Sequence, residues 1–157
     1  MPLNKTMDNE TNKLVPELRF PEFVEDGGWE NGMLNNENVA KFINEKVTLQ
    51  NLKNRTYIST ENILPDFGGV ILSAKLPSSG SFTKFAEGDI LVSNIRPYLR
   101  KIWFSNTNGT ASNDVIIIRA GRKIDKVFLS YHLKNDNFIN YVMKGAERCI
   151  SKLPALS

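Results

Sequence analysis

The sequence predicts an α+β fold: a single globular domain with an irregular, twisted β-sheet followed by C-terminal helices. Short runs of β-branched and apolar residues, separated by Gly, Pro and Asn, recur through the first two thirds of the chain. The last third places its apolar residues at helical spacings instead. Strands and helices do not alternate, which argues against a parallel sheet built from repeated strand–helix–strand units. The chain of 157 residues is long enough to bury a core.

The individual elements follow from local signals. The strongest predicted strands are Ile90–Val92 and Val115–Ile118, and Asn106–Gly109 between them predicts a hairpin or short loop. One or two helices are expected within Asp125–Ala146, ending at Gly145. The weaker predictions are a helix over residues 36–46, a strand at Thr56–Ser59, a turn at Pro65 and Gly68–Gly69, a brief strand at Val70–Leu72 and a loop over residues 77–81.

Three stretches divide the chain. Residues 1–13 are polar and are expected to form a disordered tail, residues 14–150 the globular domain, and residues 151–157 a truncated or irregular C-terminus. Within LVPELRFPEFVEDGGWE, Pro21 and the Gly27–Gly28 pair exclude a continuous helix. We expect an extended lead-in there, whose aromatic residues pack on the domain; these are Phe20, Phe23 and Trp29.

Composition narrows the class of protein. No apolar run reaches the length of a membrane span, and the N-terminus lacks the apolar stretch of a secretory signal. The single cysteine, Cys149, cannot form an internal disulfide. A cytoplasmic protein is therefore expected.

Charge is distributed unevenly along the chain. Residues 1–45 hold nine acidic and four basic residues, whereas residues 46–157 hold sixteen basic and eight acidic residues. A basic body favours a nucleic-acid partner, because binding releases counterions from phosphates. The alternative that charge alone leaves open is an excess of surface lysine that serves solubility.

The sequence contains little catalytic chemistry. The only histidine, His132, lies in the apolar pattern LSYHL, where a packed, hydrogen-bonded residue is expected rather than a base or ligand. With one His and one Cys, a zinc site is not expected, and no phosphate loop or dinucleotide fingerprint is found. Asn94 and Pro97 are spaced too widely for the Asn-Pro-Pro-Tyr motif of amino-methyltransferases. We therefore expect neither an enzyme nor a cofactor.

The stretch 88–119, GDILVSNIRPYLRKIWFSNTNGTASNDVIIIR, interleaves cations with aromatic residues between the two best strands. If residues 95–100 continued a strand, alternation would place Arg96, Tyr98 and Arg100 on one face, opposite Ile95, Pro97 and Leu99. Arginine can bind phosphate or the guanine edge, and an asparagine such as Asn94 or Asn113 can pair with adenine. The alternative is an edge strand whose arginines are simply solvated.

A second candidate contact is the loop KLPSSGSFTK, which runs from Lys75 through Ser79 to Lys84. Small hydroxyl residues between lysines suit a groove, although an ordinary surface loop explains them equally well. Thr60 or Asn62 can cap a helix or touch a ligand. Two acidic residues of the 88–119 stretch, Asp89 and Asp114, are expected in turns or caps rather than in catalysis.

Four stretches in order resemble the target recognition domain of type I restriction–modification specificity subunits. They are LRFPEF with the following Trp29, YISTENILPD, GDILVSNIRPYLRKIWF and SNDVIIIR, and the similarity covers about residues 14–146. The resemblance implies a non-catalytic domain that reads one half of a split DNA site. It also implies partner subunits: a modification (methyltransferase) subunit bound through helical spacers and, through it, a restriction subunit.

The resemblance and the residue chemistry together assign the predicted contacts with double-stranded DNA. Phosphate or guanine contacts fall to Lys75, Lys84, Arg96, Arg100 and Lys101, and base-edge or sugar contacts to Ser79, Asn94, Tyr98 and Asn113. Residues shared by domains that read different sequences would hold scaffold or backbone, so base choice would fall to the Lys75–Lys84 loop.

This sequence also departs from the pattern of the family that it resembles. Family members carry two such domains and long spacer helices, whereas ERCISKLPALS follows here, and Pro154 argues against a continuing helix. The chain is then a piece of a longer subunit, a half-subunit that forms a homodimer, or a silent cassette. The competing interpretation is a protein-interaction module or decoy that binds the modification subunit or itself and no DNA.

Overall fold

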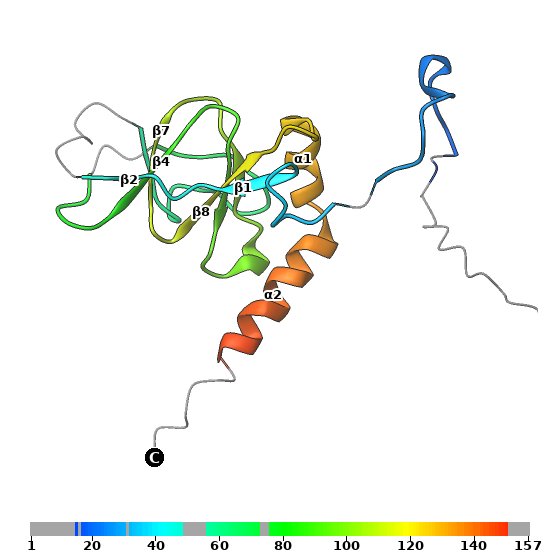
Figure 1. Cartoon of the computed structure of the whole chain (residues 1–157). Coiled ribbons are helices and arrows are strands. Elements are labelled where there is room, and N and C mark those ends of the chain that lie inside the picture. Colours follow the sequence, from blue (N-terminus) through cyan, green and yellow to red (C-terminus); the bar gives the residue numbers. More distant parts are fainter. Residues whose placement is uncertain (1–14, 16, 31, 49–55, 73–75, 151–157) are drawn as a thin grey trace, which may run out of the picture. The chain divides into compact units, whose positions relative to one another are not determined.

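The computed structural model describes residues 15, 17–30, 32–48, 56–72 and 76–150, with the side chains of residues 145–150 excepted (Figure 1). The chain divides into two compact units, residues 1–33 and residues 34–157. All the assigned strands and α-helices belong to the second unit.

The described residues of the first unit contain one short 3₁₀-helix, η1 (Pro21–Phe23). Arg19 organises the chain around it, because its guanidinium donates hydrogen bonds to the carbonyl oxygens of Phe23 at 3.1 Å and Gly27 at 3.0 Å, and also to that of Asp26. The prediction that Pro21 and the following glycines prevent a continuous helix is confirmed.

The first sheet of the second unit has the strand order β1-β8-β5-β6, and every neighbouring pair is antiparallel. Its central strand β5 (Ile90–Ser93) is buried along its whole length between β8 (Val115–Ala120) and β6 (Ile102–Phe104). The edge strand β1 (Ala40–Phe42) pairs with the far side of β8. Both strongly predicted strands are therefore confirmed, and they are neighbours in one sheet.

The second sheet has the order β2-β4-β7-β3. Strands β2 (Lys46–Val47), β4 (Phe82–Phe85) and β7 (Gly109–Ser112) pair antiparallel, whereas β3 (Thr56–Ile58) runs parallel to β7. Gly109 permits the parallel contact, because a Cβ there would lie 2.4 Å from the Thr56 carbonyl oxygen.

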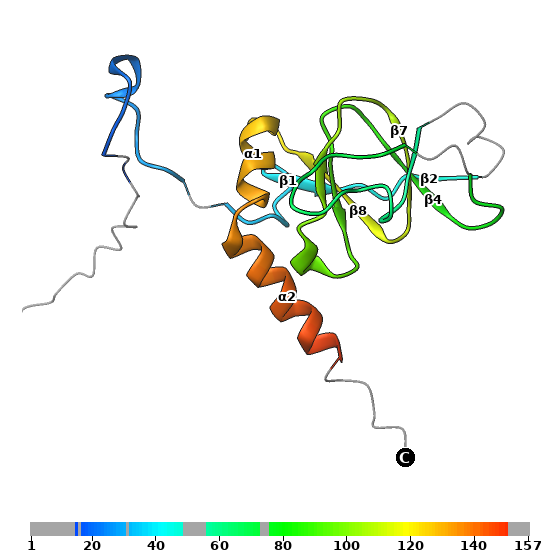
Figure 2. The ribbon, with the colours of Figure 1, turned by 180° about the vertical axis from the view of Figure 1, so that it is seen from behind.

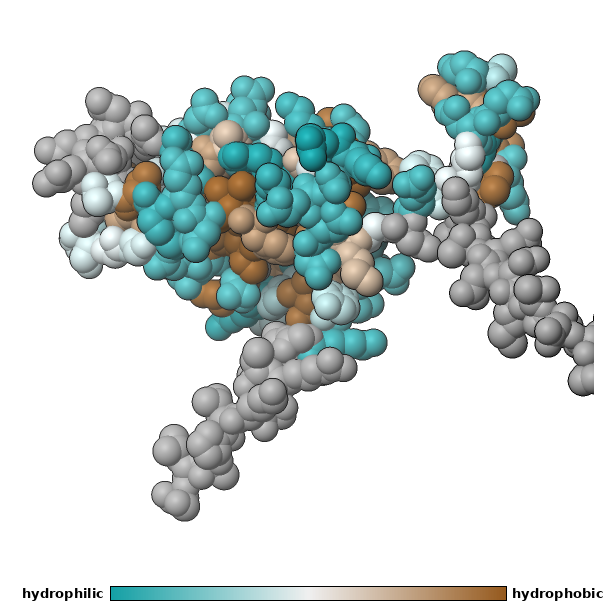
Figure 3. Space-filling model, in the orientation of Figure 1, coloured by the Kyte–Doolittle hydropathy of each residue, from teal (hydrophilic) through white to brown (hydrophobic). Residues whose placement is uncertain are grey.

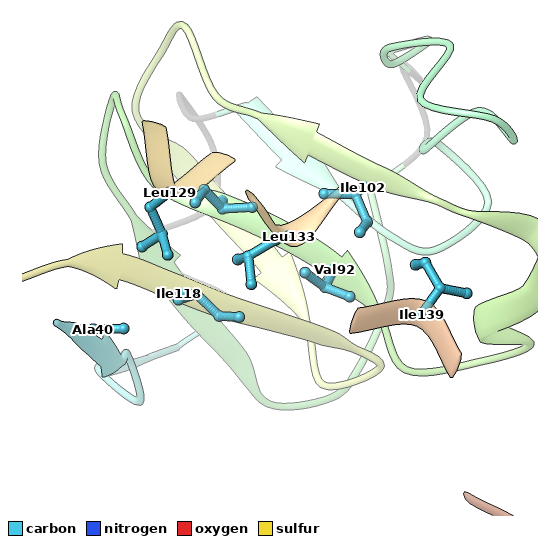
Figure 4. Close-up of a cluster of buried hydrophobic side chains, with 8 residues drawn as sticks. Ala40, Val92, Ile102, Ile118, Leu129, Leu133 and Ile139 are labelled. Carbon is cyan, nitrogen blue, oxygen red and sulfur yellow. The ribbon is translucent and has the colours of Figure 1, made fainter. Parts of the chain in front are cut away.

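The first sheet is covered on both faces, by the helices on one and by the second sheet on the other. Side chains alternate along β5, so Ile90 and Val92 share a buried cluster with Leu129 and Leu133 of the helical layer, whereas Leu91 belongs to the inter-sheet core. Figure 4 shows Val92, Leu129 and Leu133 in the first of these clusters. The inter-sheet core also contains these buried residues: Ile58, Ile63, Phe85, Ala111, Val115 and Ile117. A fully apolar central strand is the sequence signature of this double burial.

The helical layer consists of α1 (Lys126–Leu133) and α2 (Asp136–Ile150) (Figures 1 and 2). Asp125 caps α1, because its carboxylate accepts hydrogen bonds from the backbone N–H groups of Val127 and Phe128, both at 2.9 Å. One or two helices were predicted and two are found. The predicted end at Gly145 is wrong, since good helix formers follow this glycine and a single interior glycine costs only about 1 kcal/mol.

Two further sequence predictions need correction. Residues 36–46 do not form a helix, because this stretch supplies β1 and the first residue of β2, and Ala40 is buried against β8. Val70 makes only an isolated bridge with Ile63. Of the two forms predicted for Asn106–Gly109, the structure shows the short loop and not the hairpin, because β6 and β7 belong to different sheets.

Hydrophilic residues cover much of the face shown in Figure 3, and hydrophobic residues are exposed among them. One of the exposed hydrophobic residues of this unit is Phe42 on the edge strand β1. In the part of the chain that the structure describes, no helix has the length and apolar character that crossing a bilayer requires.

Candidate nucleic-acid interface

Three connections between strands are joined to one another by hydrogen bonds. The turn at residues 59–62 contacts the connection 94–101, because Lys101 Nζ donates to the Thr60 carbonyl oxygen at 2.9 Å and the hydroxyls of Thr60 and Ser93 are hydrogen-bonded. The turn at residues 113–114 contacts the same connection, since the Asn94 backbone N–H donates to the Asp114 carbonyl oxygen at 2.8 Å. We call residues 59–62, 94–101 and 113–114 the three-loop surface.

Asn62 holds the first of these turns together. Its Oδ1 accepts hydrogen bonds from the backbone N–H and the hydroxyl of Ser59, both at 2.8 Å, and its Nδ2 donates to the Ile71 carbonyl oxygen at 2.9 Å. The side chain is 7% exposed, so its polar capacity is used inside the protein. Of the roles that the sequence left open for Asn62, the structure shows that of a turn organiser.

The predicted strand alternation over residues 95–100 is wrong. Pro97–Leu99 forms the 3₁₀-helix η3, and Arg96 and Arg100 flank it with positive φ angles of 51° and 53°. Ile95 is exposed, although the alternation had placed it in the core. Proline lacks the N–H that a strand needs and favours the first position of a helical turn, which explains why a 3₁₀-helix and not a strand begins at Pro97.

Backbone strain is concentrated beside this connection. Among the described residues, every non-glycine residue with positive φ lies either in η3's flanks or in the turn that contains Asp66 and Phe67. The two turns are hydrogen-bonded to each other, from Asp66 N–H to the Leu99 carbonyl oxygen and from Phe67 N–H to that of Arg100. Such conformations cost of the order of 1–3 kcal/mol each and are typical of binding sites.

The predicted cations of the connection 94–101 differ in their freedom. Arg96 is exposed, and within the described part of the chain its guanidinium has neither a hydrogen bond nor an ion pair. Arg100 forms an ion pair with Asp136 of α2 at 2.8 Å, and the Lys101 ammonium donates to the Thr60 carbonyl oxygen. Tyr98 between them is exposed. Arg96 is therefore the cation most available to an outside phosphate.

Asn94 and Asn113 are both exposed, but their amides differ. The side chain of Asn94 makes no hydrogen bond within the described residues, whereas Asn113 Oδ1 accepts one from Lys46 Nζ at 2.9 Å. Sequence reasoning missed Lys46, because only the pairing of β2 with β4 brings residue 46 beside residue 113.

The second predicted contact region is not joined to the three-loop surface. Lys84 on β4 forms an ion pair with Glu45 at 3.0 Å, and Ser79 is exposed in the connection before this strand. Within the described residues no hydrogen bond or ion pair links Ser79 or Lys84 to the three-loop surface. Lys75 lies outside the described residues.

The three-loop surface also carries carboxylates, so its charge is mixed. Glu61 and Asp114 are exposed close to Tyr57, whose pKa is raised above its ordinary value, mainly by burial and further by these two negative charges. The Tyr57 ring lies edge-on to Phe82, with 5.7 Å between the ring centroids. Any polyanion at this surface meets Arg96 and Lys46 beside acidic neighbours.

His132 and Cys149 are the residues that the sequence analysis considered for catalysis. His132 is exposed and its ring stacks on that of Phe128 at 5.7 Å, so the prediction of a packed, hydrogen-bonded histidine is wrong. Cys149 lies in α2. The described residues contain no group of three or more His, Cys, Asp or Glu side chains arranged to hold a metal ion.

Asp89 is a turn residue, as predicted, because its Oδ2 accepts a hydrogen bond from the Ala86 N–H at 2.7 Å. It also forms a bidentate ion pair with Arg119, which sequence reasoning missed.

The fold and the three-loop surface together define a small α+β domain whose connections, anchored on two sheets, are free to meet a partner. No protein-family model and no curated protein matches the chain. Among solved structures it is similar to one that addresses complex assembly and conformational transition of the type I R-M system, with 20% identity and a TM-score of 0.54 over 76% of this chain and 35% of the other.

A second similar structure is the HsdS subunit from Thermoanaerobacter tengcongensis, with 24% identity and a TM-score of 0.49 over 69% of this chain and 28% of the subunit. The chain thus spans about a third or less of the length of these proteins. The α+β fold predicted from the sequence pattern is confirmed, and it is similar to the fold of a type I restriction–modification protein.

Proposed function

We propose that the chain is a DNA-recognition domain of a type I restriction–modification specificity subunit. In this role it catalyses nothing itself. It binds one half of a target site and directs a modification subunit and, through it, a restriction subunit to that site. The observation that carries the proposal is the unpaired Arg96 on a strained connection that is hydrogen-bonded to two other turns.

A rigid placement of the recognition side chains supports this proposal. Recognition side chains need a scaffold that holds them in place, and connections anchored on sheets provide one. Arg96 supplies a charge for phosphate, and Asn94 supplies a free amide for a base edge. Tyr98 adds an exposed ring beside them. Phosphate contacts then set the affinity and its salt dependence, whereas the amide contributes to the choice of sequence.

The remaining parts of the proposal follow from the same assignment. The recognition domain comprises residues 14–150, and it acts in the cytoplasm without a cofactor. In this role the chain acts together with a second recognition domain and spacer helices, supplied by another part of the subunit or by a second copy of the chain. Similarity to a structure concerned with complex assembly supports partner subunits in general.

The test is duplex binding by the full chain as a function of salt. We expect Arg96→Ala to weaken binding and to reduce the slope of log K against log salt by about 0.9, the value for one phosphate contact. Lys123→Ala is the matched control, because Lys123 is also an exposed cation but lies outside the three-loop surface. Equal losses in the two variants would contradict the assignment of Arg96. Binding to the modification subunit without binding to any duplex would favour the interaction module instead.

A further inference from the structure

Lys46 and Asn113 form a polar pair on the surface of the second sheet. The Lys46 ammonium donates to Asn113 Oδ1 at 2.9 Å and to Thr83 Oγ1 at 3.0 Å. Lys46 and Asn113 are exposed, whereas Thr83 is 4% exposed. An ammonium can only donate hydrogen bonds, so this contact fixes the Asn113 amide with its oxygen toward Lys46 and its NH₂ group away from it.

The fixed orientation decides which hydrogen-bonding groups remain available. Two of the three ammonium protons of Lys46 are used, and the third is free. The Asn113 NH₂ group has no hydrogen-bond partner among the described residues, so both of its protons are free as well. The pair therefore presents several donors side by side, together with one positive charge.

That charge changes what Asn113 can recognise. Asparagine pairs with adenine by accepting from the N6 amino group and donating to N7. Here a positive charge lies 2.9 Å from the amide oxygen, where it repels an incoming amino group. Guanine presents two adjacent acceptors, O6 and N7, in the major groove, and these match adjacent donors.

The pair is placed within reach of the same ligand as the three-loop surface. Asn113 belongs to that surface, and the carbonyl oxygen of the next residue, Asp114, accepts the backbone hydrogen bond from Asn94. Lys46 is held there by its strand, because it is the register partner of Thr83 in the β2–β4 pair.

We propose that Lys46 and Asn113 act together as a donor pair that selects guanine at one position of the recognised sequence, in place of the adenine contact predicted for Asn113 alone. Thr83 is the positioning residue that aims the Lys46 ammonium. This inference rests on the proposed DNA-recognition function and names two residues that determine its specificity.

The test compares the sequences that variants select from a randomised duplex pool. The full-length wild type is expected to select a consensus with a guanine that Lys46→Met no longer requires, and discrimination of guanine over adenine there falls about ten-fold or more. Lys46→Arg keeps the donors and retains the guanine. Thr83→Val relaxes the preference in the same direction as Lys46→Met. Lys41→Met, at an exposed lysine of the other sheet, leaves the consensus unchanged.

Modified duplexes separate a base contact from a phosphate contact. Replacing the selected guanine by 7-deazaguanine removes the N7 acceptor, so it weakens wild-type binding and leaves binding by Lys46→Met unaffected. If Lys46→Met instead weakens binding to all duplexes equally, reduces the salt slope and keeps the consensus, Lys46 contacts phosphate and the donor-pair inference fails, while DNA recognition stands. A wild type that binds no duplex at all overturns both.

Discussion

At the scale of single residues, Asp89 stabilises more of the structure than the turn in which it lies. The side chain is 1% exposed, accepts the Ala86 N–H, and binds the Arg119 guanidinium through two contacts of 2.7 Å. One carboxylate therefore ties the turn before β5 to the strand β8. The hydrogen bond with Asp89 also raises the pKa of Arg119 above its ordinary value, so Arg119 remains charged wherever the protein is folded.

Asp89→Asn is expected to lower the free energy of unfolding by about 2 kcal/mol, because it removes charge-assisted hydrogen bonds and leaves buried polar atoms incompletely paired. The loss stays below that of a fully buried ion pair, since the Arg119 side chain is 44% exposed. Urea denaturation measures it. Glu87→Gln is the control, as this exposed carboxylate lies in the same turn; an equal loss there would rule out a special role for Asp89.

The Tyr57 hydroxyl is expected to make the free energy of unfolding depend on pH. Burial raises its pKa in the folded protein above the ordinary value of 10.0, so the unfolded chain loses this proton first as the pH rises. The free energy of unfolding therefore falls above pH 10, and the contribution of Tyr57 is constant below it. Tyr57→Phe removes the titration. The difference in stability between the two proteins should be flat up to about pH 9.5 and then shift in favour of the variant; a flat difference to pH 11 would contradict the burial effect.

Residue chemistry could be predicted from the sequence only where the partner is local. Asp125 directly precedes an apolar helical run, so its capping role depends only on neighbouring residues. Pro97 carries a similar local signal, but the strand alternation predicted over residues 95–100 overlooked it. The pairs Lys46–Asn113 and Asp89–Arg119 join residues 67 and 30 positions apart, and nothing in the local pattern marks them. Such long-range pairs determine which cations are free. This is why the structure, and not the sequence, distinguishes the unpaired Arg96 from the paired Arg100.

At the scale of elements, η3 and the N-terminus of α2 are linked by the ion pair between Arg100 and Asp136. A phosphate at the connection 94–101 would compete with Asp136 for the same guanidinium. An exposed pair of this kind contributes about 0–1 kcal/mol to stability, so breaking it leaves the fold intact. If the proposed function holds, the pair is therefore a competitor of DNA rather than a support of the domain.

Asp136→Asn is accordingly expected to leave the thermal midpoint nearly unchanged and to increase duplex affinity about two- to five-fold at 50 mM salt, with a smaller gain at 200 mM. Titrations of a fluorescent duplex measure both. Glu37→Gln removes another exposed carboxylate from an ion pair, that with Lys41, and so corrects for net charge. If both variants bind equally well, Arg100 does not contribute to DNA binding.

The sequence could predict elements where burial dominates the pattern. The apolar runs of β5 and β8 are buried on both faces, and α2 has its apolar residues at clear helical spacing. The helix predicted over residues 36–46 was wrong, although the residue spacing suits a helix in isolation. The pairing of Ala40 with Ala120 of β8 makes part of this stretch the strand β1 instead. The strand alternation predicted over residues 95–100 was wrong because apolar and polar residues alternate there only by chance, in a stretch that forms a 3₁₀ turn.

At the scale of the whole molecule, two cores share one sheet. The helical core contains Ile90, Val92 and Ile118, and the inter-sheet core contains Leu91 and Ile117 from the same two strands. Loosening one face of β5 or β8 therefore disturbs the packing of the other. The helices and the second sheet are expected to unfold in one transition rather than as separate layers.

Leu133→Ala tests this coupling, because Leu133 is buried in the helical core and makes no part of the inter-sheet core. We expect a loss of about 3 kcal/mol in the free energy of unfolding. Trp103 packs against the inter-sheet core, with its ring 5.9 Å from that of Phe85, and becomes the only tryptophan in a Trp29→Phe background. In that background, helical circular dichroism and Trp103 fluorescence should report the same midpoint before the substitution and the same lower midpoint after it. A shift in the circular dichroism alone would show that the helices unfold independently and that the two sheets form a stable core without them.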